Sequence, residues 1–150
     1  MTGGSAFERE GEWLKAALHT HSTRSDGLLD PGAMVDHYEW LGFDVIAITD
    51  HWTLTKGSST ENILVITGAE LAADAPAGMG NDVEILAIGI DDIPEDPGGD
   101  RENWGHIENF FYKTFSNLSA AASAIDAQGG VGFIAHPYWS GMTLEPILDA

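Results

Sequence analysis

Short runs rich in Val, Ile and Leu constrain the fold of this chain more than any other feature of its sequence. The clearest are FDVIAITDH at 43–51, NILVITGAEL at 62–71, VEILAIGI at 83–90 and VGFIAHP at 131–137, and WLKAALHTH at 13–21 is a weaker one because of its alanines. Apolar runs of this length are typical of strands that are covered on both faces. The sequence therefore predicts about five strands.

A helix is predicted at 29–42, where several start and stop signals agree. Asp30 can cap its N-terminus, Pro31 suits the first helical position, and Gly42 follows as a stop signal. The side chains expected on its buried face, because they recur at helical spacing, are Met34, Tyr38 and Leu41.

A second and longer helical pattern follows the Pro- and Gly-rich loop at 94–103. Its apolar residues are spaced by three, four or seven: Trp104, Ile107, Phe111, Phe115, Leu118 and Ile125. Gly129 and Gly130 end this helix, and another is predicted to begin within 143–150. Strands that alternate with helices predict an α/β sheet or barrel that is mainly parallel.

The chain is strongly acidic, with 6 Lys and Arg against 24 Asp and Glu, and a formal net charge of -18. A surface of this sign repels phosphate backbones, so general nucleic-acid binding is not expected. One phosphorylated substrate held by bound cations is compatible with this charge. The acidity reflects either ordinary solubilising charge or adaptation to high salt, and the sequence leaves both open.

Residues 1–12 form a polar leader without the pattern of a signal peptide. No segment approaches the apolar length of a membrane span. We therefore expect a cytoplasmic protein with no membrane partner and one domain at 13–150.

Potential metal ligands follow the apolar runs. His19 and His21 lie two residues apart at a strand end, so both side chains are expected on one face, with Thr20 on the other. The other candidates at or just beyond such ends are Asp26, His51, Glu70 and His136. In parallel α/β folds the carboxyl ends of the strands meet at one rim. The chain has no cysteine, so imidazole and carboxylate ligands predict a site for Zn, Mn or Fe.

Other ionisable residues have plainer explanations. His37 falls inside the first helix and is expected to be packed or on the surface, and His106 is expected to be exposed. Asp50 precedes the ligand candidate His51 and is expected to orient that side chain without binding the ion itself. Arg24 either contacts a phosphate oxygen of the substrate or is a solvated loop residue.

Four motifs, in this order and at these intervals, resemble the first four motifs of the PHP family, named for polymerase and histidinol phosphatase. They are HTHSTRSDG at 19–27, ITDH at 48–51, GAE at 68–70 and AHP at 135–137. The closer match is to the stand-alone metal-dependent phosphoesterases and the CehA/McbA-type hydrolases. The resemblance covers the N-terminal portion of that family's domain and implies a distorted, TIM-like (β/α)7 barrel with up to three metal ions at its rim.

Carried over by motif, the ligands of a first ion are His19, His21 and Glu70. The resemblance further implies that Glu70 bridges to a second ion, which His136 also binds. Asp26 and His51 are then the ligands of a third ion.

Two features depart from the family pattern. Family members often carry a histidine where VEILAIG has Glu84, which here either replaces it as an oxygen ligand, leaves the second ion weakly held, or is simply exposed. The family's late Asp and His motif has no counterpart before Ala150, and a related eight-stranded barrel needs roughly 200–250 residues. We therefore expect 13–150 to be an incomplete PHP domain whose open sheet edge favours self-association.

The function that the resemblance implies is hydrolysis of a phosphomonoester or phosphodiester by water that two or three divalent ions activate. No side chain is assigned as a general acid. One alternative keeps the metals but cleaves a carbamate or another ester, as in CehA/McbA-type relatives. Another is an inactive, truncated module that binds metal weakly or not at all.

Overall fold

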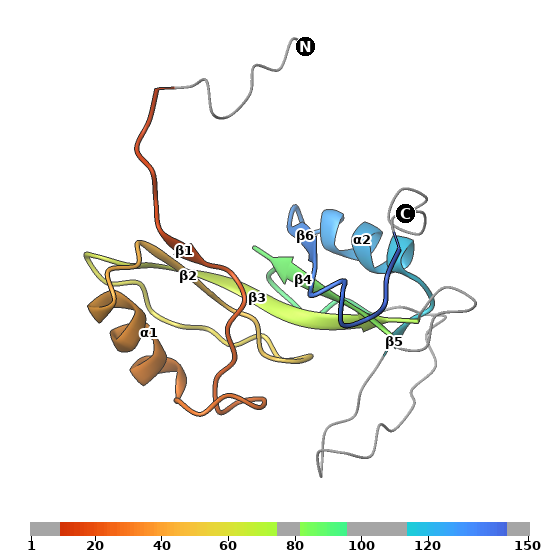
Figure 1. The fold of residues 1–150 in the computed structure, drawn as a ribbon, viewed down its shortest axis with the longest axis horizontal. Helices are drawn as coiled ribbons and strands as arrows, with labels where there is room; N and C mark the ends of the chain where they lie inside the picture. The colour runs from red at the N-terminus through yellow and green to blue at the C-terminus, as the bar shows by residue number, and fades with distance from the viewer. Residues whose placement is uncertain (1–9, 75–81, 96–113, 144–150) are drawn as a thin grey trace.

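The computed structural model describes residues 10–74, 82–95 and 114–143, which form a mixed α/β fold around one curled sheet (Figure 1). In chain order the elements are β1 (Ala16–Ala17), α1 (Pro31–Trp40), β2 (Val45–Ile48), β3 (Leu64–Ala73), β4 (Val83–Ile88), β5 (Thr114–Phe115), α2 (Leu118–Asp126) and β6 (Val131–Ile134). Within these ranges, the helices are too short or too polar to cross a membrane.

The strands of the described sheet lie in the order β1-β2-β3-β4-β6, and β5 pairs separately with β3. Strands β1, β2 and β3 are parallel, as predicted. Strand β4 is the exception to a mainly parallel arrangement, because it runs antiparallel to both β3 and β6. Its start therefore lies beside the end of β3, where Ala73 pairs with Val83.

The length of β3 explains why the sheet curls. Its first residues, 64–67, pair with β2, and its last six, 68–73, pair with β4. Figure 1 shows β3 as the long strand that continues from the α1 end of the molecule to the α2 end. This curled half-barrel is consistent with part of a barrel fold.

Helix α1 covers β2 and begins where the sequence predicted. Met34 and Val35 are buried against Ile46, Ile48 and Ile63. The prediction for Leu41 is wrong, because this residue is the C-cap and is 41% exposed. Val35 is the second buried residue of this helix instead, packed in the same cluster as Met34.

The N-cap of α1 gives a first testable prediction. The Asp30 side chain accepts hydrogen bonds from the backbone N–H groups of Gly32, at 3.0 Å, and Ala33, at 3.1 Å. Asp30→Ala is expected to lower the free energy of unfolding by about 1 kcal/mol, measured by urea denaturation. The control is Asp36→Ala in the same helix, which removes an exposed carboxylate without a capping role. Equal losses in both variants would contradict the capping argument.

Helix α2 begins later than the spacing of apolar residues predicted. Asn117 is its N-cap, and its side chain accepts the N–H of Ala120 at 2.9 Å. Phe115 lies before this cap, in β5, where it pairs with Ala73 and stacks on Trp52 at 5.7 Å between ring centroids. The prediction that Phe115 belongs to the helix is therefore wrong, while Leu118 and Ile125 are helical and buried.

Some predictions lie outside the described residues. They concern most of the leader 1–12, most of the loop 94–103, the helical pattern at 104–113 with His106, and the helix expected within 143–150.

In the described sheet β6 is an edge strand, on which Val131 is 55% and Phe133 45% exposed. Self-association through such an edge stays a prediction.

Candidate metal centre

Five segments that are distant in the sequence deliver side chains to one end of the curled sheet. His19 and His21 follow β1, His51 follows β2, and Glu70 lies on β3. Asp26 lies in the turn before α1, Glu84 is near the start of β4, and His136 follows β6. An isolated parallel bridge between His51 and Glu70 continues the pairing of β2 with β3 and fixes these two residues side by side.

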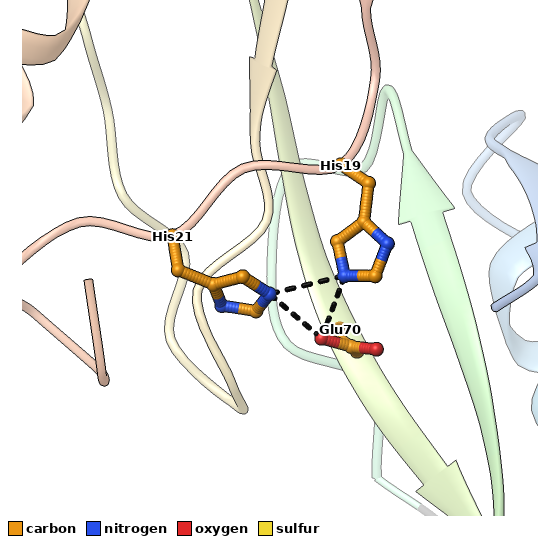
Figure 2. Close-up of side chains that lie close together, drawn as sticks. All are labelled: His19, His21 and Glu70. Carbon is orange, nitrogen blue, oxygen red and sulfur yellow. Dashed lines mark hydrogen bonds and ion pairs between the residues drawn. The ribbon is translucent and has the colours of Figure 1, made fainter. Parts of the chain in front are cut away.

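His19, His21 and Glu70 form the tightest group (Figure 2). The two Nε2 atoms lie 3.0 Å apart, and the Glu70 Oε2 atom lies 3.1 Å from that of His19 and 3.0 Å from that of His21. Thr20 between them is buried, and its hydroxyl donates to the carbonyl of Ala47 at 2.8 Å. This anchor explains why both imidazoles project to the same side, as the spacing predicted.

These separations fit a shared divalent ion. Ligand atoms about 2.0–2.1 Å from an ion lie about 2.9 Å apart in octahedral geometry and about 3.4 Å apart in tetrahedral geometry. The three atoms of the group, at 3.0–3.1 Å, lie between these values. A neutral imidazole nitrogen and a carboxylate oxygen are also suitable donors for Zn, Mn or Fe.

A second group consists of His21, Asp26 and His51. The Asp26 carboxylate lies 3.2 Å from His21 Nδ1 and 3.7 Å from His51 Nε2. The rings of His21 and His51 are stacked, with their centroids 4.7 Å apart. His21 thus contributes one ring nitrogen to each of two groups.

A third group consists of His51, Glu70 and Glu84. His51 Nδ1 lies 3.6 Å from Glu70 Oε2 and 3.9 Å from Glu84 Oε1. His136 joins this end of the site, since its Nε2 lies 3.1 Å from Glu70 Oε1 and 3.4 Å from Glu84 Oε2. The Glu84 side chain, which the sequence left open, therefore lies in the site.

Glu70 is the carboxylate shared between groups, and it is 1% exposed. Burial raises its pKa, but hydrogen bonds from His19 and His21 and the charge of His51 outweigh this, so the net pKa lies well below its usual range. Glu84 shows the opposite balance, because burial and the nearby charge of Glu70 both raise its pKa. A buried carboxylate that stays ionised is suited to bind a cation.

The backbone is strained next to the site. His136 has a φ of +26° and Trp52, directly after His51, has a φ of +47°. Residues with a side chain rarely adopt this left-handed conformation, and where they do the position is often functional. The strain at His136 turns the chain at the end of β6, where its ring meets Glu70 and Glu84.

Asp50 holds the loop that carries two of the candidate ligands. It is fully buried and accepts hydrogen bonds from the Ser22 N–H at 2.6 Å, the Ser22 hydroxyl at 2.6 Å, the Ser25 hydroxyl at 2.8 Å and the Thr55 hydroxyl. Ser25 Oγ is also 3.3 Å from His21 Nδ1. Burial raises the pKa of Asp50, but the bonds from Ser22, Thr55 and Ser25 outweigh it and lower the pKa overall.

Glycine is required where this loop closes. The Gly27 N–H donates to the Ser22 carbonyl at 2.9 Å, and a Cβ added at Gly27 would lie 1.8 Å from the His21 carbonyl oxygen. The sequence singled out Asp50 as the residue that orients His51, and that role stays a prediction. The bonds of Asp50 to Ser22, Ser25 and Thr55 were missed. The only signal for them was the density of hydroxyl residues around the histidine pair.

Arg24 and His37 lie outside the three ligand groups. The Arg24 side chain is exposed, and its backbone N–H donates to Ser22 Oγ at 3.1 Å, so its contact with a substrate stays a prediction. His37 is exposed on α1, where its ring stacks on Trp40 with centroids 6.0 Å apart, in agreement with the surface position expected for it.

Comparisons with known proteins come from sequence and from structure. No protein-family model matches the sequence. A 5′-3′ exoribonuclease of Haemophilus influenzae is 32% identical over 83 residues, which are 51% of this chain and 29% of that protein. A crystal structure from Bacteroides vulgatus, of a two-domain protein containing a predicted PHP-like metal-dependent phosphoesterase, matches 87% of this chain with a TM-score of 0.55 and 24% identity.

The chain spans only a part of either protein, since the match covers 37% of the Bacteroides vulgatus chain and 29% of the exoribonuclease. At 24% identity the structural likeness is one of fold. This chain therefore shares its mixed α/β half-barrel with part of the two-domain Bacteroides vulgatus protein.

Proposed function

We propose that this chain carries the metal centre of a PHP-type hydrolase that cleaves phosphate esters. The observation that carries the proposal is the overlap of three potential ligand groups, in which His21, His51 and Glu70 each belong to two. Such overlap places candidate ligands for more than one ion side by side, and the two oxygens of Glu70 allow it to bind two ions. The names of the two similar proteins, a phosphoesterase and an exoribonuclease, both describe action on phosphate esters.

Each ion would have its own set of side chains. The first set is His19, His21 and Glu70, the second is Asp26 with His51, and the third is Glu70, Glu84 and His136. A neutral imidazole binds one ion through one ring nitrogen, so His21 and His51 each serve one ion, whereas the Glu70 carboxylate can serve two. When bound, divalent ions activate water for attack on an ester and stabilise the charge that develops on phosphate oxygens. Two or three ions are expected, since the groups share ligands.

The burial of the ligands divides the site into a floor and a rim. Glu70 lies at the floor with 1% exposure, whereas the side chains of His19 and His136 are 33% and 34% exposed. The floor supplies a fixed negative charge that holds cations, and the rim is open to a substrate from solution. A small phosphate ester fits this arrangement better than a nucleic-acid backbone, because the acidic surface repels a polyanion.

Metal counting tests the centre directly. The purified chain, stripped with a chelator and dialysed against Mn²⁺ or Zn²⁺, is expected to retain about two equivalents, measured by emission spectrometry. His19→Ala is expected to lose about one of them, since the first group then keeps two of its three ligands. The matched control is His37→Ala, which removes an exposed imidazole on α1. No retained metal, or equal retention in all three proteins, would contradict the centre.

Hydrolysis is then tested on the metal-loaded chain with a phosphomonoester, a phosphodiester, a short RNA, a carboxylic ester and a carbamate. Cleavage of the phosphate esters, lost on chelation and restored by metal, is the expected result. Cleavage of the carbamate or carboxylic ester alone would replace the phosphoesterase proposal with the CehA/McbA-type alternative. Bound metal without cleavage of any compound would leave a metal-binding module in place of an enzyme.

A further inference from the structure

The two ends of the site present different donor atoms. At one end, here called the nitrogen-rich end, His19 Nε2, His21 Nε2 and Glu70 Oε2 lie within 3.1 Å of one another. At the other, the oxygen-rich end, His136 Nε2 faces Glu70 Oε1 at 3.1 Å and Glu84 Oε2 at 3.4 Å. The nearest donors at one end are thus two imidazoles and one carboxylate, and at the other they are one imidazole and two carboxylates. His51 Nδ1 lies farther out, at 3.6 Å from Glu70 Oε2 and 3.9 Å from Glu84 Oε1.

The fold builds the oxygen-rich end with Glu84 as a fixed member. Because β4 is antiparallel to β3, Glu84 pairs with Ala72 and lies one step from the end of the strand that carries Glu70. The Glu84 carbonyl accepts the N–H of Ala135 at 2.8 Å, which fixes Glu84 beside His136. Its side chain is 24% exposed, so the carboxylate is largely withdrawn from water.

Two carboxylates in this position repel each other. Glu70 and Glu84 contact the same imidazole from different strands, and both are screened from solvent. A cation bound between them offsets the repulsion and lets both groups stay ionised. A neutral histidine at position 84 would not create this need.

We propose that Glu84 makes the oxygen-rich end selective for a harder cation, Mn²⁺, while the nitrogen-rich end takes Zn²⁺, so that the centre holds two unlike ions. The inference rests on the metal centre of the proposed function. Zn²⁺ binds most nitrogen and oxygen sites more tightly than Mn²⁺, but its advantage is greatest at imidazole nitrogens and smaller at carboxylate oxygens. With one equivalent of Zn²⁺ at the nitrogen-rich end, the end with two carboxylates is therefore the place where Mn²⁺ binds. Glu84 is therefore the residue that sets the metal preference of one position without altering the other.

The test measures binding of the metals themselves. Chelator-stripped chain that has been given one equivalent of Zn²⁺ is titrated with Mn²⁺, and free Mn²⁺ is followed by its electron paramagnetic resonance signal. The wild-type chain is expected to bind one equivalent of Mn²⁺ while retaining its Zn²⁺. Glu84→Gln is expected to weaken Mn²⁺ binding about tenfold to a hundredfold, while Zn²⁺ binding is unchanged.

A gain-of-function variant and a charge control complete the experiment. Glu84→His is expected to bind a second equivalent of Zn²⁺ in preference to Mn²⁺, an effect that misfolding could not produce. Asp36→Asn removes one negative charge from the exposed face of α1 and is expected to bind both metals as the wild type does.

Three outcomes would overturn the inference. Glu84→Gln could bind Mn²⁺ as Asp36→Asn does, or the Zn²⁺-loaded wild type could bind no Mn²⁺, or Glu84→His could keep the wild-type preference. Each leaves the metal centre in place. Failure of the wild type to bind either metal would instead overturn the centre itself and the proposed function with it.

Discussion

Glu70→Gln is expected to reduce metal binding at both ends of the site by at least about a thousandfold, or roughly 4 kcal/mol. The reason is that one buried carboxylate serves both ends, with Oε2 beside His19 and His21 and Oε1 beside His136. Glutamine keeps the shape but removes the charge and turns one oxygen into an N–H donor. Competition with a chromophoric chelator measures the change, and metal-dependent hydrolysis is expected to fall in parallel.

The control for this substitution is Glu61→Gln, the same chemical change at an exposed position before β3. It is expected to bind metal as the wild type does. Circular dichroism of the metal-free proteins separates the loss of a ligand from the loss of the fold. If folded Glu70→Gln retained its metal at either end with wild-type affinity, Glu70 would not be the shared ligand.

The parts of the site that could be predicted from the sequence follow from one geometric rule. Parallel strands bring their carboxyl ends to one rim, and His51, directly after β2, lies beside Glu70 of the parallel strand β3. The prediction that Glu70 ends its strand is wrong, because β3 continues to Ala73. The two-residue spacing of His19 and His21 likewise sufficed to place both rings on one face, because Thr20 between them is buried and its hydroxyl is bonded to the Ala47 carbonyl. Their roles as ligands stay predictions.

The position of Glu84 could not be predicted in the same way. An apolar run does not state the direction in which its strand enters the sheet, and β4 enters antiparallel. In an antiparallel strand, a residue near the start lies at the same edge of the sheet as the residues at the ends of the parallel strands. The helical spacing that included Phe115 failed for a related reason, since Asn117 caps the helix after it and β3 offers Phe115 a strand partner.

The contacts of Asp50 could not be predicted from the sequence either, because they are made with Ser22 and Ser25, which lie 28 and 25 residues away. These contacts make Asp50 the second residue whose loss is expected to be large. Asp50→Ala is expected to lower the free energy of unfolding by about 3–5 kcal/mol, since it leaves one buried N–H and several hydroxyls without their acceptor. Urea denaturation of the metal-free chain measures this change, with exposed Asp36→Ala as the control.

The sign of the pH dependence distinguishes this charge-assisted network from simple packing. The folded-state pKa of Asp50 is lowered, so its stabilising contribution is present above its ordinary pKa of about 3.9 and is lost as the pH falls through the lower folded value. Asp50→Asn keeps the volume and removes the charge, and it is expected to unfold more easily than the wild type near neutral pH. The difference is expected to narrow below about pH 4, because the unfolded wild-type chain then takes up a proton at Asp50 while the folded carboxylate is still ionised.

Asp50→Asn also tests how the fold supports the metal centre. Asp50 reaches His21 through Ser25, whose hydroxyl donates to Asp50 Oδ1 and lies 3.3 Å from both His21 Nδ1 and Asp26 Oδ1. Loosening this hydroxyl is expected to weaken binding at the group of His21, Asp26 and His51 more than at the oxygen-rich end, which has no member on the loop. Equal weakening at both ends would mean that Asp50 supports the fold as a whole rather than the position of the loop.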